Sequence, residues 1–318
     1  MHTVLLSAPY MIPFADRFVP ELEAAGCRVI IPTVNERMEE DDLLPYAGEI
    51  DGTICGDDRY TRRVIERSPR LKIISKWGTG IDSIDQAACR EYGIRIGNTP
   101  GAFTVPVADS VFAYLLSFAR RTPWMDAEMK GGHWEKIPGK TLGECTLGII
   151  GLGNIGSAVA RRAAAFGMTI FGNDPKPAAK QLVADTGLQQ TDLDTLLSQS
   201  DFVTLHCDLN ATSQHLIAAR QLLRMKRTGV LINTSRGPVV DETALCAALS
   251  AGVIAGAGLD VFEHEPLPLV SPLRGMSNVL LAPHNSNSSP VAWERVHQNS
   301  MKNLLSGLRD VKRGRRAA

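Results

Sequence analysis

The sequence predicts an α/β protein made of two doubly wound parallel sheets, with one domain inserted into the other. Short apolar runs rich in β-branched residues alternate with stretches of helical pattern that end at Gly or Pro, first over residues 2–98 and again over 146–284. Two longer segments of helical pattern, 101–121 and 289–307, flank the second unit. The chain therefore returns to its first unit after completing the second, which indicates an insertion.

The first unit is expected to contain five strands and three intervening helices. Its strands are expected at 2–9, 27–32, 51–56, 71–78 and 94–98, and its helices at 18–26, 61–69 and 84–93. The strands of the second unit are expected at 146–150, 168–174, 201–209, 229–235, 253–262 and 278–284. This pattern predicts a first domain of 1–99 plus 286–318 and an inserted domain of 100–285.

Composition and charge indicate an ordinary globular protein without a nucleic-acid or membrane partner. Of 318 residues, 44% are hydrophobic and 21% charged, and 34 basic side chains balance 34 acidic ones, so no net field attracts a polyanion. The six cysteines include no CxxC pair, which argues against a disulfide framework or a bound metal. No apolar stretch is long enough to span a bilayer and no leader is recognisable, so we expect a cytoplasmic protein.

A glycine-rich turn opens the second unit. The run TLGII, with strand character, is followed by GLGNIG and then by the helical stretch SAVARRAAAF. Gly151 permits a tight turn, Gly153 lets the backbone approach a pyrophosphate, and Gly156 lets helix and strand pack closely. This context predicts a Rossmann domain that binds a dinucleotide at the helix N-terminus. The cofactor contacts expected from this turn are those of Gly151, Gly153, Asn154, Ile155 and Gly156.

The kind of dinucleotide depends on an acid at the end of the next strand. Asp174 lies 18 residues beyond Gly156, where a carboxylate accepts a hydrogen bond from a ribose 2′-hydroxyl and repels a 2′-phosphate. NAD is therefore the expected cofactor, although the nearby cation of Lys176 leaves NADP open. The sequence contains no GxxxxGK[ST] loop, which argues against a nucleoside triphosphate.

Polar side chains follow three apolar runs of the second unit. Arg236 follows GVLINTS, and His284 follows NVLLAP. The exit of the third run, GAGLDVFEHEP, offers Asp260, Glu263, His264 and Glu265, and spacing alone does not choose among them. An arginine can hold a carboxylate and polarise the adjacent carbonyl, a histidine can exchange the hydroxyl proton, and a carboxylate can orient the imidazole. The triple suits hydride transfer on a 2-hydroxy acid. His206, after DFVTL, competes for the role of base, and spacing alone does not rank it against His284.

The chain resembles the D-isomer-specific 2-hydroxyacid dehydrogenases, in particular their phosphoglycerate-dehydrogenase-like branch. The resemblance is carried by LKIISKWGTGIDSID, NTPGAFTVPVADSVFAYLLSFAR, GIIGLGNIG, HCDLNATSQHLI, MKRTGVLINTSRGPVVDETAL, LDVFEHEP and LAPH. It implies a Rossmann NAD-binding domain inserted into a flavodoxin-like substrate domain, in a homodimer joined through the NAD-binding domain. It also implies Arg236 as the carboxylate and carbonyl anchor, Glu265 as the partner of the base, and His284 as the general acid/base.

The resemblance further implies where the two ligands bind. Backbone amides around 78–80 would hold the carboxylate of the 2-hydroxy or 2-oxo acid, and Asp260 would face the nicotinamide amide. The expected substrate contacts are those of Lys76, Trp77, Gly78, Thr79 and Gly80. Further cofactor contacts are expected from His206, Thr234, Ser235 and Asp260.

Departures from the family pattern leave the substrate open. Members that use 3-phosphoglycerate usually carry an Arg-Ser pair where this chain has Cys55-Gly56, and the acids Asp57 and Asp58 follow, which would repel a phosphate. The Ile-Gly pair usual after the catalytic histidine is replaced by Asn285-Ser286. Phosphoglycerate, glyoxylate, hydroxypyruvate, lactate-type acids and an inorganic donor such as phosphite therefore stay as candidate substrates. A remote alternative is an NAD-sensing corepressor, a role that some relatives of the family have.

Overall fold

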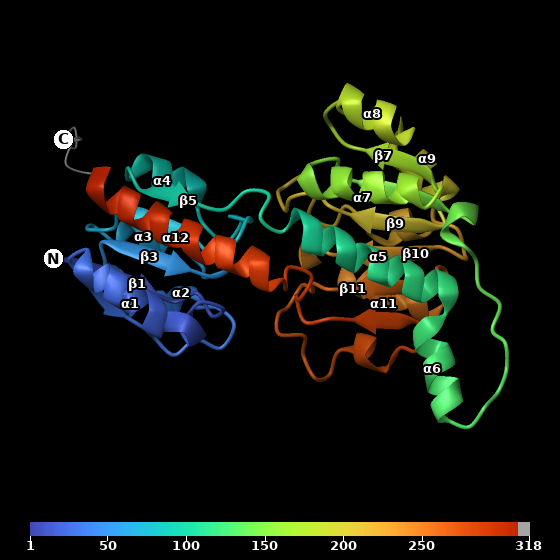
Figure 1. Ribbon diagram of the computed structural model, residues 1–318, viewed down its shortest axis with the longest axis horizontal. Helices are drawn as coiled ribbons and strands as arrows, with labels where there is room; N and C mark the ends of the chain where they lie inside the picture. Colours follow the sequence, from blue (N-terminus) through green and yellow to red (C-terminus); the bar gives the residue numbers. More distant parts are fainter. Residues whose placement is uncertain (311–318) are drawn as a thin grey trace. The chain divides into compact units, whose positions relative to one another are not determined.

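The computed structural model describes residues 1–310, and the chain divides into two compact units (Figure 1). Unit 1 contains Met1–Phe103 and the segment from Ser289 onward, and unit 2 contains Thr104–Ser288. Within residues 1–310, no helix combines the length and the hydrophobicity that crossing a lipid bilayer requires.

The chain passes between the units a few residues later than the sequence suggested. The loop before Thr104 stays with unit 1 because the Thr99 N–H donates to Gly78 O at 2.8 Å and the Phe103 ring packs on Trp77. At the return crossing, Ser286 stays with unit 2 because its N–H donates to Asp260. These contacts join residues far apart in the chain, so the local pattern could not locate the crossings.

Unit 1 is a five-stranded parallel sheet with the strand order β2-β1-β3-β4-β5. This is the order of the flavodoxin-like doubly wound fold, so the predicted fold class is confirmed for this unit. The strands span His2–Leu6 (β1), Cys27–Ile30 (β2), Gly52–Cys55 (β3), Ile73–Lys76 (β4) and Arg95–Gly97 (β5). The helices span Ile12–Phe14 (η1), Ala15–Ala24 (α1), Glu40–Ala47 (α2), Arg62–Glu66 (α3), Gln86–Glu91 (α4) and Pro290–Asp310 (α12). Helix α12 packs against β3, β4 and β5 and so completes the unit (Figure 1).

The strand order of unit 1 reverses between β1 and β3, and protein atoms fill the carboxyl edge of the sheet there. In doubly wound sheets, such a reversal opens a crevice that often binds a ligand. Here Ser7 Oγ, after β1, donates a 2.5 Å hydrogen bond to Asp58 Oδ2, after β3. Pro9 is so close to Gly56 that a Cβ on this glycine would lie 2.8 Å from Pro9 Cδ. The chain itself therefore closes this reversal point.

Asp58 at this position is completely buried, and its Oδ1 also accepts the Met38 N–H at 2.9 Å. Burial raises the pKa of Asp58 from 3.8 to about 6, because desolvation outweighs the two hydrogen bonds that favour the charged form. A carboxyl group with a raised pKa binds its proton more tightly in the folded than in the unfolded chain. Its contribution to stability is thus largest at acid pH and is lost as the pH rises from about 4 to 6.

We expect Asp58→Asn to remove this dependence on pH. Between pH 4 and pH 7, the free energy of unfolding of the wild-type protein should fall relative to that of the variant by up to about 3 kcal/mol, which corresponds to about 2 pKa units. Urea unfolding followed by tryptophan fluorescence at the two pH values measures the difference. If the difference between the two proteins is the same at both values, the pKa of Asp58 is not raised.

Unit 2 is a seven-stranded parallel sheet with the strand order β12-β11-β10-β9-β6-β7-β8. Counted from β6, this is the Rossmann order 3-2-1-4-5-6 with a seventh strand, so the fold class is confirmed here too. The strands span Thr146–Ile150 (β6), Thr169–Asn173 (β7), Gln189–Gln190 (β8), Phe202–Leu205 (β9), Val230–Asn233 (β10), Gly256–Leu259 (β11) and Val279–Leu281 (β12). The helices span Thr104–Arg120 (α5), Thr122–Lys130 (α6), Leu142–Glu144 (η2), Asn154–Ala165 (α7), Lys180–Thr186 (α8), Leu193–Gln199 (α9), Ala219–Leu222 (α10), Gly237–Val239 (η3), Glu242–Ser250 (α11) and Pro272–Gly275 (η4).

The long helix expected at 101–121 is followed by a second helix that the sequence pattern did not predict. Helix α5 ends at Arg120 because Arg121 adopts a left-handed conformation with a φ of 59°. Helix α6 starts directly afterwards, with Pro123 in its first turn. The Arg121 guanidinium lies 4.1 Å from the centre of the Trp124 ring, and this cation–π contact supports the sharp turn.

Candidate active site

The glycine-rich turn joins β6 to α7 where the strand order of unit 2 reverses. Gly151 has a φ of 91° and packs on the loop after β9, so that a Cβ there would lie 2.6 Å from the carbonyl carbon of His206. A Cβ on Gly156 would lie only 1.9 Å from Gly151 O. In contrast, a Cβ on Gly153, the N-cap of α7, would have no atom within 4 Å. Of these three positions, only Gly153 borders open space, and there the first-turn N–H groups of α7 can receive a pyrophosphate.

Gly156→Ala and Gly153→Ala are therefore expected to fail in different ways. Alanine at position 156 should lower the Tm, because overpacking against backbone typically costs about 1–3 kcal/mol or more. Alanine at position 153 should leave the Tm unchanged but weaken NADH binding, because its methyl group takes up the space beside the helix N-terminus. Thermal unfolding and titration of NADH fluorescence separate the two effects. Equal Tm values for the two variants would contradict the geometry of the turn.

Asp174 lies directly after β7 and contacts the glycine turn. Its Oδ2 accepts the Leu152 N–H and its Oδ1 accepts the Lys176 N–H, both at 2.8 Å. These bonds fix the carboxylate at the carboxyl edge of β7, against the turn that leads into α7 at Asn154 and Ile155. This is the place where a Rossmann fold presents its acceptor for a ribose hydroxyl.

His206, after β9, is held by the neighbouring strand. Its backbone N–H donates to Ile150 O at 2.7 Å, and its Nε2 lies 3.0 Å from Thr204 Oγ1. Burial lowers the pKa of the His206 imidazole to about 3. A general acid/base works best with a pKa near the working pH. Among the described residues His206 Nδ1 has no hydrogen-bond partner, whereas His284 Nδ1 has the Glu265 carboxylate, and this contrast favours His284 as the base.

The loop after β10 carries Arg236 on a turn organised by Asn233. The Asn233 Oδ1 accepts the N–H of Ser235 at 3.0 Å and its hydroxyl at 2.8 Å, and the Asn233 Nδ2 donates to Arg236 O at 2.9 Å. Thr234 is buried, and its hydroxyl has no hydrogen-bond partner in the part of the chain that the structure describes. The sequence analysis did not single out Asn233, although an Asn at a strand end before a loop is a usual turn-forming residue.

Arg236, Glu265 and His284 follow β10, β11 and β12, which are neighbours in the sheet. Gly237, next to the arginine, packs so tightly on the loop after β11 that a Cβ would lie 1.9 Å from the carbonyl carbon of Phe262. Glu265 Oε1 accepts the Phe262 N–H at 2.9 Å, and Glu265 Oε2 lies 2.9 Å from His284 Nδ1. The structure thus pairs the predicted base with its predicted carboxylate and places the arginine loop against the same turn.

Asp260 determines the backbone of the His284 loop. Its carbonyl accepts the His284 N–H at 2.7 Å, and its buried carboxylate accepts the N–H groups of Asn285 at 2.7 Å and Ser286 at 2.9 Å. His284 has a φ of 52°, a left-handed conformation that a non-glycine residue keeps only when its surroundings hold it. The sequence predicted Asp260 as a cofactor contact, and the structure adds the role of fixing this loop.

In unit 1, Lys76 at the end of β4 is a buried cation. Only 4% of the residue is exposed, and its Nζ lies 3.1 Å from Asp57 Oδ1 and donates to Trp77 O at 3.2 Å. A buried ammonium group needs such a partner, because burial without one is costly. The positive charge at the predicted substrate loop is therefore already paired with an acid.

The backbone of 78–80 forms an open turn directly after Lys76 and Trp77. Gly78 has a φ of 127°, and its carbonyl accepts the Thr99 N–H. Within residues 1–310, no acceptor is found for the N–H groups of Gly78, Thr79 and Gly80. Successive N–H donors of this kind bind anions well, so the turn suits a carboxylate.

Trp77 is held by a partner that the sequence analysis did not find. Its Nε1 donates to His297 Nδ1 on α12 at 2.9 Å, and the rings of Tyr10 and Trp293 lie 5.3 Å and 5.9 Å from it. Burial lowers the pKa of His297, which keeps the imidazole able to accept this hydrogen bond. No local pattern connects these segments, because only the packing of α12 on the sheet brings them together.

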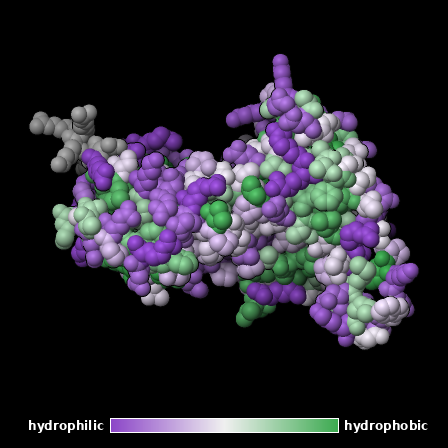
Figure 2. Space-filling model, viewed as in Figure 1, coloured by the Kyte–Doolittle hydropathy of each residue, from purple (hydrophilic) through white to green (hydrophobic). Residues whose placement is uncertain are grey.

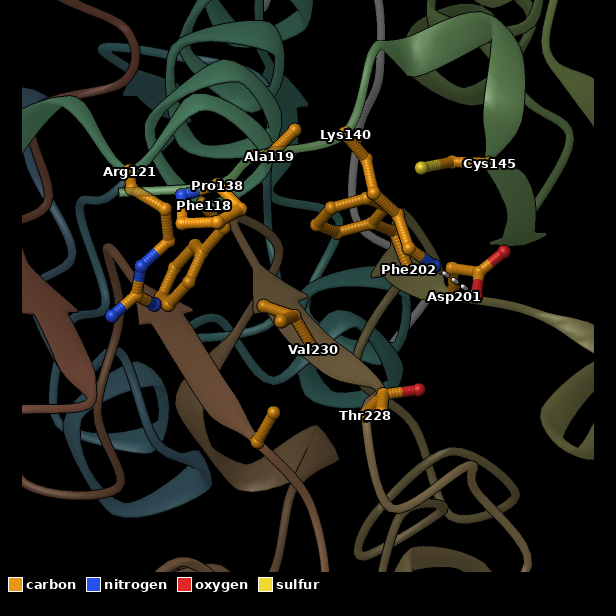
Figure 3. A pocket seen from close by; sticks show the side chains of 12 residues that line it. Phe118, Ala119, Arg121, Pro138, Lys140, Cys145, Asp201, Phe202, Thr228 and Val230 are labelled. Atoms are coloured by element: carbon orange, nitrogen blue, oxygen red, sulfur yellow. Dashed lines mark ion pairs between the residues drawn. The ribbon is translucent and has the colours of Figure 1, made fainter. Parts of the chain in front are cut away.

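A separate cavity of about 300 Å³ lies at the opposite edge of the unit 2 sheet (Figure 3). Phe202 and Val230, at the starts of β9 and β10, line it together with Phe118 of α5. Lys140 Nζ lies 3.5 Å from Asp201 Oδ1 in its wall (Figure 3). Because the cavity lies at the amino ends of the strands, it is distinct from the glycine turn and the three predicted catalytic residues.

Comparisons with known proteins agree with this geometry. Residues 112–286 match the family model described as D-isomer specific 2-hydroxyacid dehydrogenase, NAD binding domain. A glyoxylate reductase from Korarchaeum cryptofilum is 43% identical over 255 residues, 78% of this chain and 76% of that one. A D-3-phosphoglycerate dehydrogenase from Methanocaldococcus jannaschii is 40% identical over 277 residues, 85% of this chain and 52% of that longer one. The crystal structure of a D-lactate dehydrogenase from Aquifex aeolicus with NAD and lactic acid gives a TM-score of 0.84 at 28% identity, covering 94% of this chain and 93% of that one.

A Rossmann glycine turn with an acid after the second strand, and a carboxylate-paired histidine on the same sheet edge, are the features expected of an NAD-dependent oxidoreductase. The chain belongs to the D-isomer specific 2-hydroxyacid dehydrogenase family. It is therefore an NAD-dependent enzyme that acts on the CH–OH group of 2-hydroxy acids, as the sequence predicted.

Proposed function

We propose that the protein reduces a small, unphosphorylated 2-oxo acid, such as glyoxylate or hydroxypyruvate, to the corresponding 2-hydroxy acid with NADH. The observation that carries the proposal is the 2.9 Å contact between His284 and Glu265, on the strand ends next to that of Arg236. A proton donor and a fixed cation on one sheet edge are what reduction of a carbonyl group requires.

We propose the following roles for the three residues of unit 2. Arg236 forms bidentate hydrogen bonds with the substrate and polarises its carbonyl oxygen. Glu265 holds Nδ1 of His284, so the imidazole gives its proton to that oxygen from Nε2 during reduction and takes it back during oxidation. Bound NADH supplies the hydride. Asp260 keeps the His284 loop in place, and its remaining lone pairs suit the nicotinamide amide.

The remaining predicted contacts support binding of the two ligands. We propose that the N–H groups of 78–80 hold the substrate carboxylate, with Lys76 and Trp77 supporting that turn. The phosphates of NAD bind at 151–156, and Asp174 accepts the ribose hydroxyl. His206, Thr234 and Ser235 border the cofactor at the ends of β9 and β10.

The charges of unit 1 favour a substrate without phosphate. Lys76 is already paired with Asp57 at 3.1 Å, and the buried Asp58 follows at once. Cys55 replaces the arginine expected in enzymes for 3-phosphoglycerate, and burial raises the pKa of its thiol well above 9.0, so the thiol is neutral. A phosphate group would therefore find acids here and no unpaired cation among these residues. The glyoxylate reductase relative is the better guide to the substrate than the phosphoglycerate dehydrogenase.

We further propose a cytoplasmic homodimer. The six cysteines are free thiols, which suits a reducing compartment. Figure 2 shows apolar side chains gathered over α5 in unit 2, and Trp134, in the segment after α6, is 86% exposed. Exposed apolar surface of this kind suits contact with a second copy.

The test is NADH oxidation, followed at 340 nm, with a matched panel of acids. Glyoxylate, hydroxypyruvate and pyruvate are compared with phosphohydroxypyruvate, which differs from hydroxypyruvate only by its phosphate. We expect kcat/KM for hydroxypyruvate to exceed that for phosphohydroxypyruvate by at least about tenfold. The reverse order would assign the protein to phosphoglycerate metabolism, and NADH binding without turnover on any acid would favour the corepressor reading.

A further inference from the structure

One histidine, His215, joins the loop of Arg236 to the loop of Glu265. It lies between β9 and α10, outside the three strand ends that carry the predicted catalytic residues. Its backbone N–H donates to Pro238 O at 2.8 Å, and its Nε2 lies 2.6 Å from Glu263 Oε1. Each of these partners is two residues from a predicted catalytic residue. His215 is therefore hydrogen-bonded to both loops at once.

The backbone around His215 is fixed on the arginine loop. Ile217 forms a parallel bridge with Val240: its N–H donates to Val239 O at 3.1 Å, and its carbonyl accepts the Asp241 N–H at 3.0 Å. His215 itself has a φ of 50°, a left-handed conformation that requires such support. The position of the imidazole thus follows the position of the arginine loop.

On the other side, Glu263 belongs to the turn that places Glu265. The neighbouring Phe262 N–H donates to Glu265 Oε1, and Glu265 Oε2 contacts His284. The Glu263 N–H donates to Glu242 Oε2 at 3.2 Å, which ties the turn to α11. A displacement of Glu263 would therefore also displace the Glu265 carboxylate, which orients His284.

We propose that His215 is a positioning residue, which sets the separation between Arg236 and the Glu265–His284 pair without touching the substrate. This inference rests on the roles proposed above for those three residues. The side chains of His215 and Glu263 are 46% and 24% exposed, and polar pairs this accessible to water add little to folding stability. A misplacement of catalytic groups by about 1 Å, in contrast, can slow a reaction about 10²-fold. Loss of the pair should appear in catalysis and hardly in stability.

Because alanine is strained at the φ of 50° that His215 adopts, the test uses His215→Asn, whose shorter side chain tolerates this backbone, in kinetics with the best substrate of the wild-type enzyme. We expect kcat/KM to fall by about tenfold or more, mainly through kcat, with unchanged NADH affinity and a Tm within about 2 °C of wild type. His215→Gln should restore most of the activity, because its amide nitrogen can reach the place of Nε2. His264→Ala is the matched control: this exposed histidine lies in the same turn, and its side chain makes no hydrogen bond in the described part of the chain. It should behave as wild type.

A double-mutant cycle with Glu263→Ala shows whether the two side chains act as one unit. Each single variant should lose the same activity, and the double variant no more than either. Additive losses, or a fall in Tm that parallels the loss of activity, would overturn the role of His215.

A readout independent of turnover separates this inference from the proposed function. In histidine-selective ¹⁵N NMR spectra, His215→Asn should shift the His284 Nδ1–H resonance, and His264→Ala should not. An unshifted resonance would refute the positioning role. A wild-type protein inactive on every acid would refute only the proposed function, because the NMR result stands without turnover.

Discussion

Replacing His284 by alanine should lower kcat for the best 2-oxo acid by about 10²–10⁴-fold, the usual contribution of a positioned acid/base group. The imidazole is the group proposed to give its proton to the carbonyl oxygen, and its pairing with Glu265 at 2.9 Å fixes it for that purpose. NADH affinity should stay within about twofold, because the glycine turn follows β6, a different strand. Single-turnover kinetics with saturating NADH measure the chemical step directly.

The left-handed backbone of His284 requires a second variant. Alanine at a φ of 52° is strained, so that a loss of activity could come from a relaxed loop. Asparagine tolerates this conformation, and His284→Asn should show the same loss in kcat. Turnover close to wild type in both variants would remove this histidine from the mechanism and with it the proposed reaction.

Arg236→Ala is expected to reduce kcat/KM by about 10³-fold, because truncating one partner of a desolvated charge pair costs several kcal/mol. KM should rise because the carboxylate loses its anchor, and kcat should fall because the carbonyl oxygen is no longer polarised. Steady-state kinetics over a wide range of 2-oxo acid concentration separate the two effects. A rise in KM at constant kcat would mean that the arginine binds the substrate and plays no part in the chemical step.

Arg236→Lys provides the control for charge. Lysine keeps the positive charge but lacks the planar fork, so it should recover only part of the lost activity. Asn233 organises the turn, and the guanidinium adds one hydrogen bond to the same loop, from Nη1 to Ser235 O at 2.9 Å. Both variants should therefore unfold at nearly the wild-type temperature, and a large fall in Tm would point to a structural role.

The sequence predicted the two sheets well because the strands of parallel sheets are buried on both faces and read as continuous apolar runs. Strands β3, β9 and β10 are buried along their whole length, as expected. The glycine turn was equally recognisable, because the GLGNIG spacing between a strand and a helix is local, and the close contact of Gly156 with Gly151 arises within a few residues. The roles of the polar residues at the strand ends could be assigned only through the resemblance to a known family.

The contacts that organise the site were not predictable, because each joins distant parts of the chain. The Trp77 indole bonds to His297, 220 residues later, and the Asp260 carboxylate holds backbone N–H groups 25 and 26 residues away. Such bonds depend on the packing of whole helices and loops, and no local periodicity records them. The same holds for His215, whose partners come from loops after two other strands.

The closed reversal point of unit 1 has a consequence for how much coenzyme the protein takes up. Both units are doubly wound parallel sheets, and the point where the strand order reverses is a possible nucleotide-binding site in either of them. In unit 1, Pro9 and the hydrogen bond between Ser7 and Asp58 occupy the reversal point. In unit 2, the reversal point is open beside Gly153. Each polypeptide should therefore saturate at a stoichiometry of one dinucleotide.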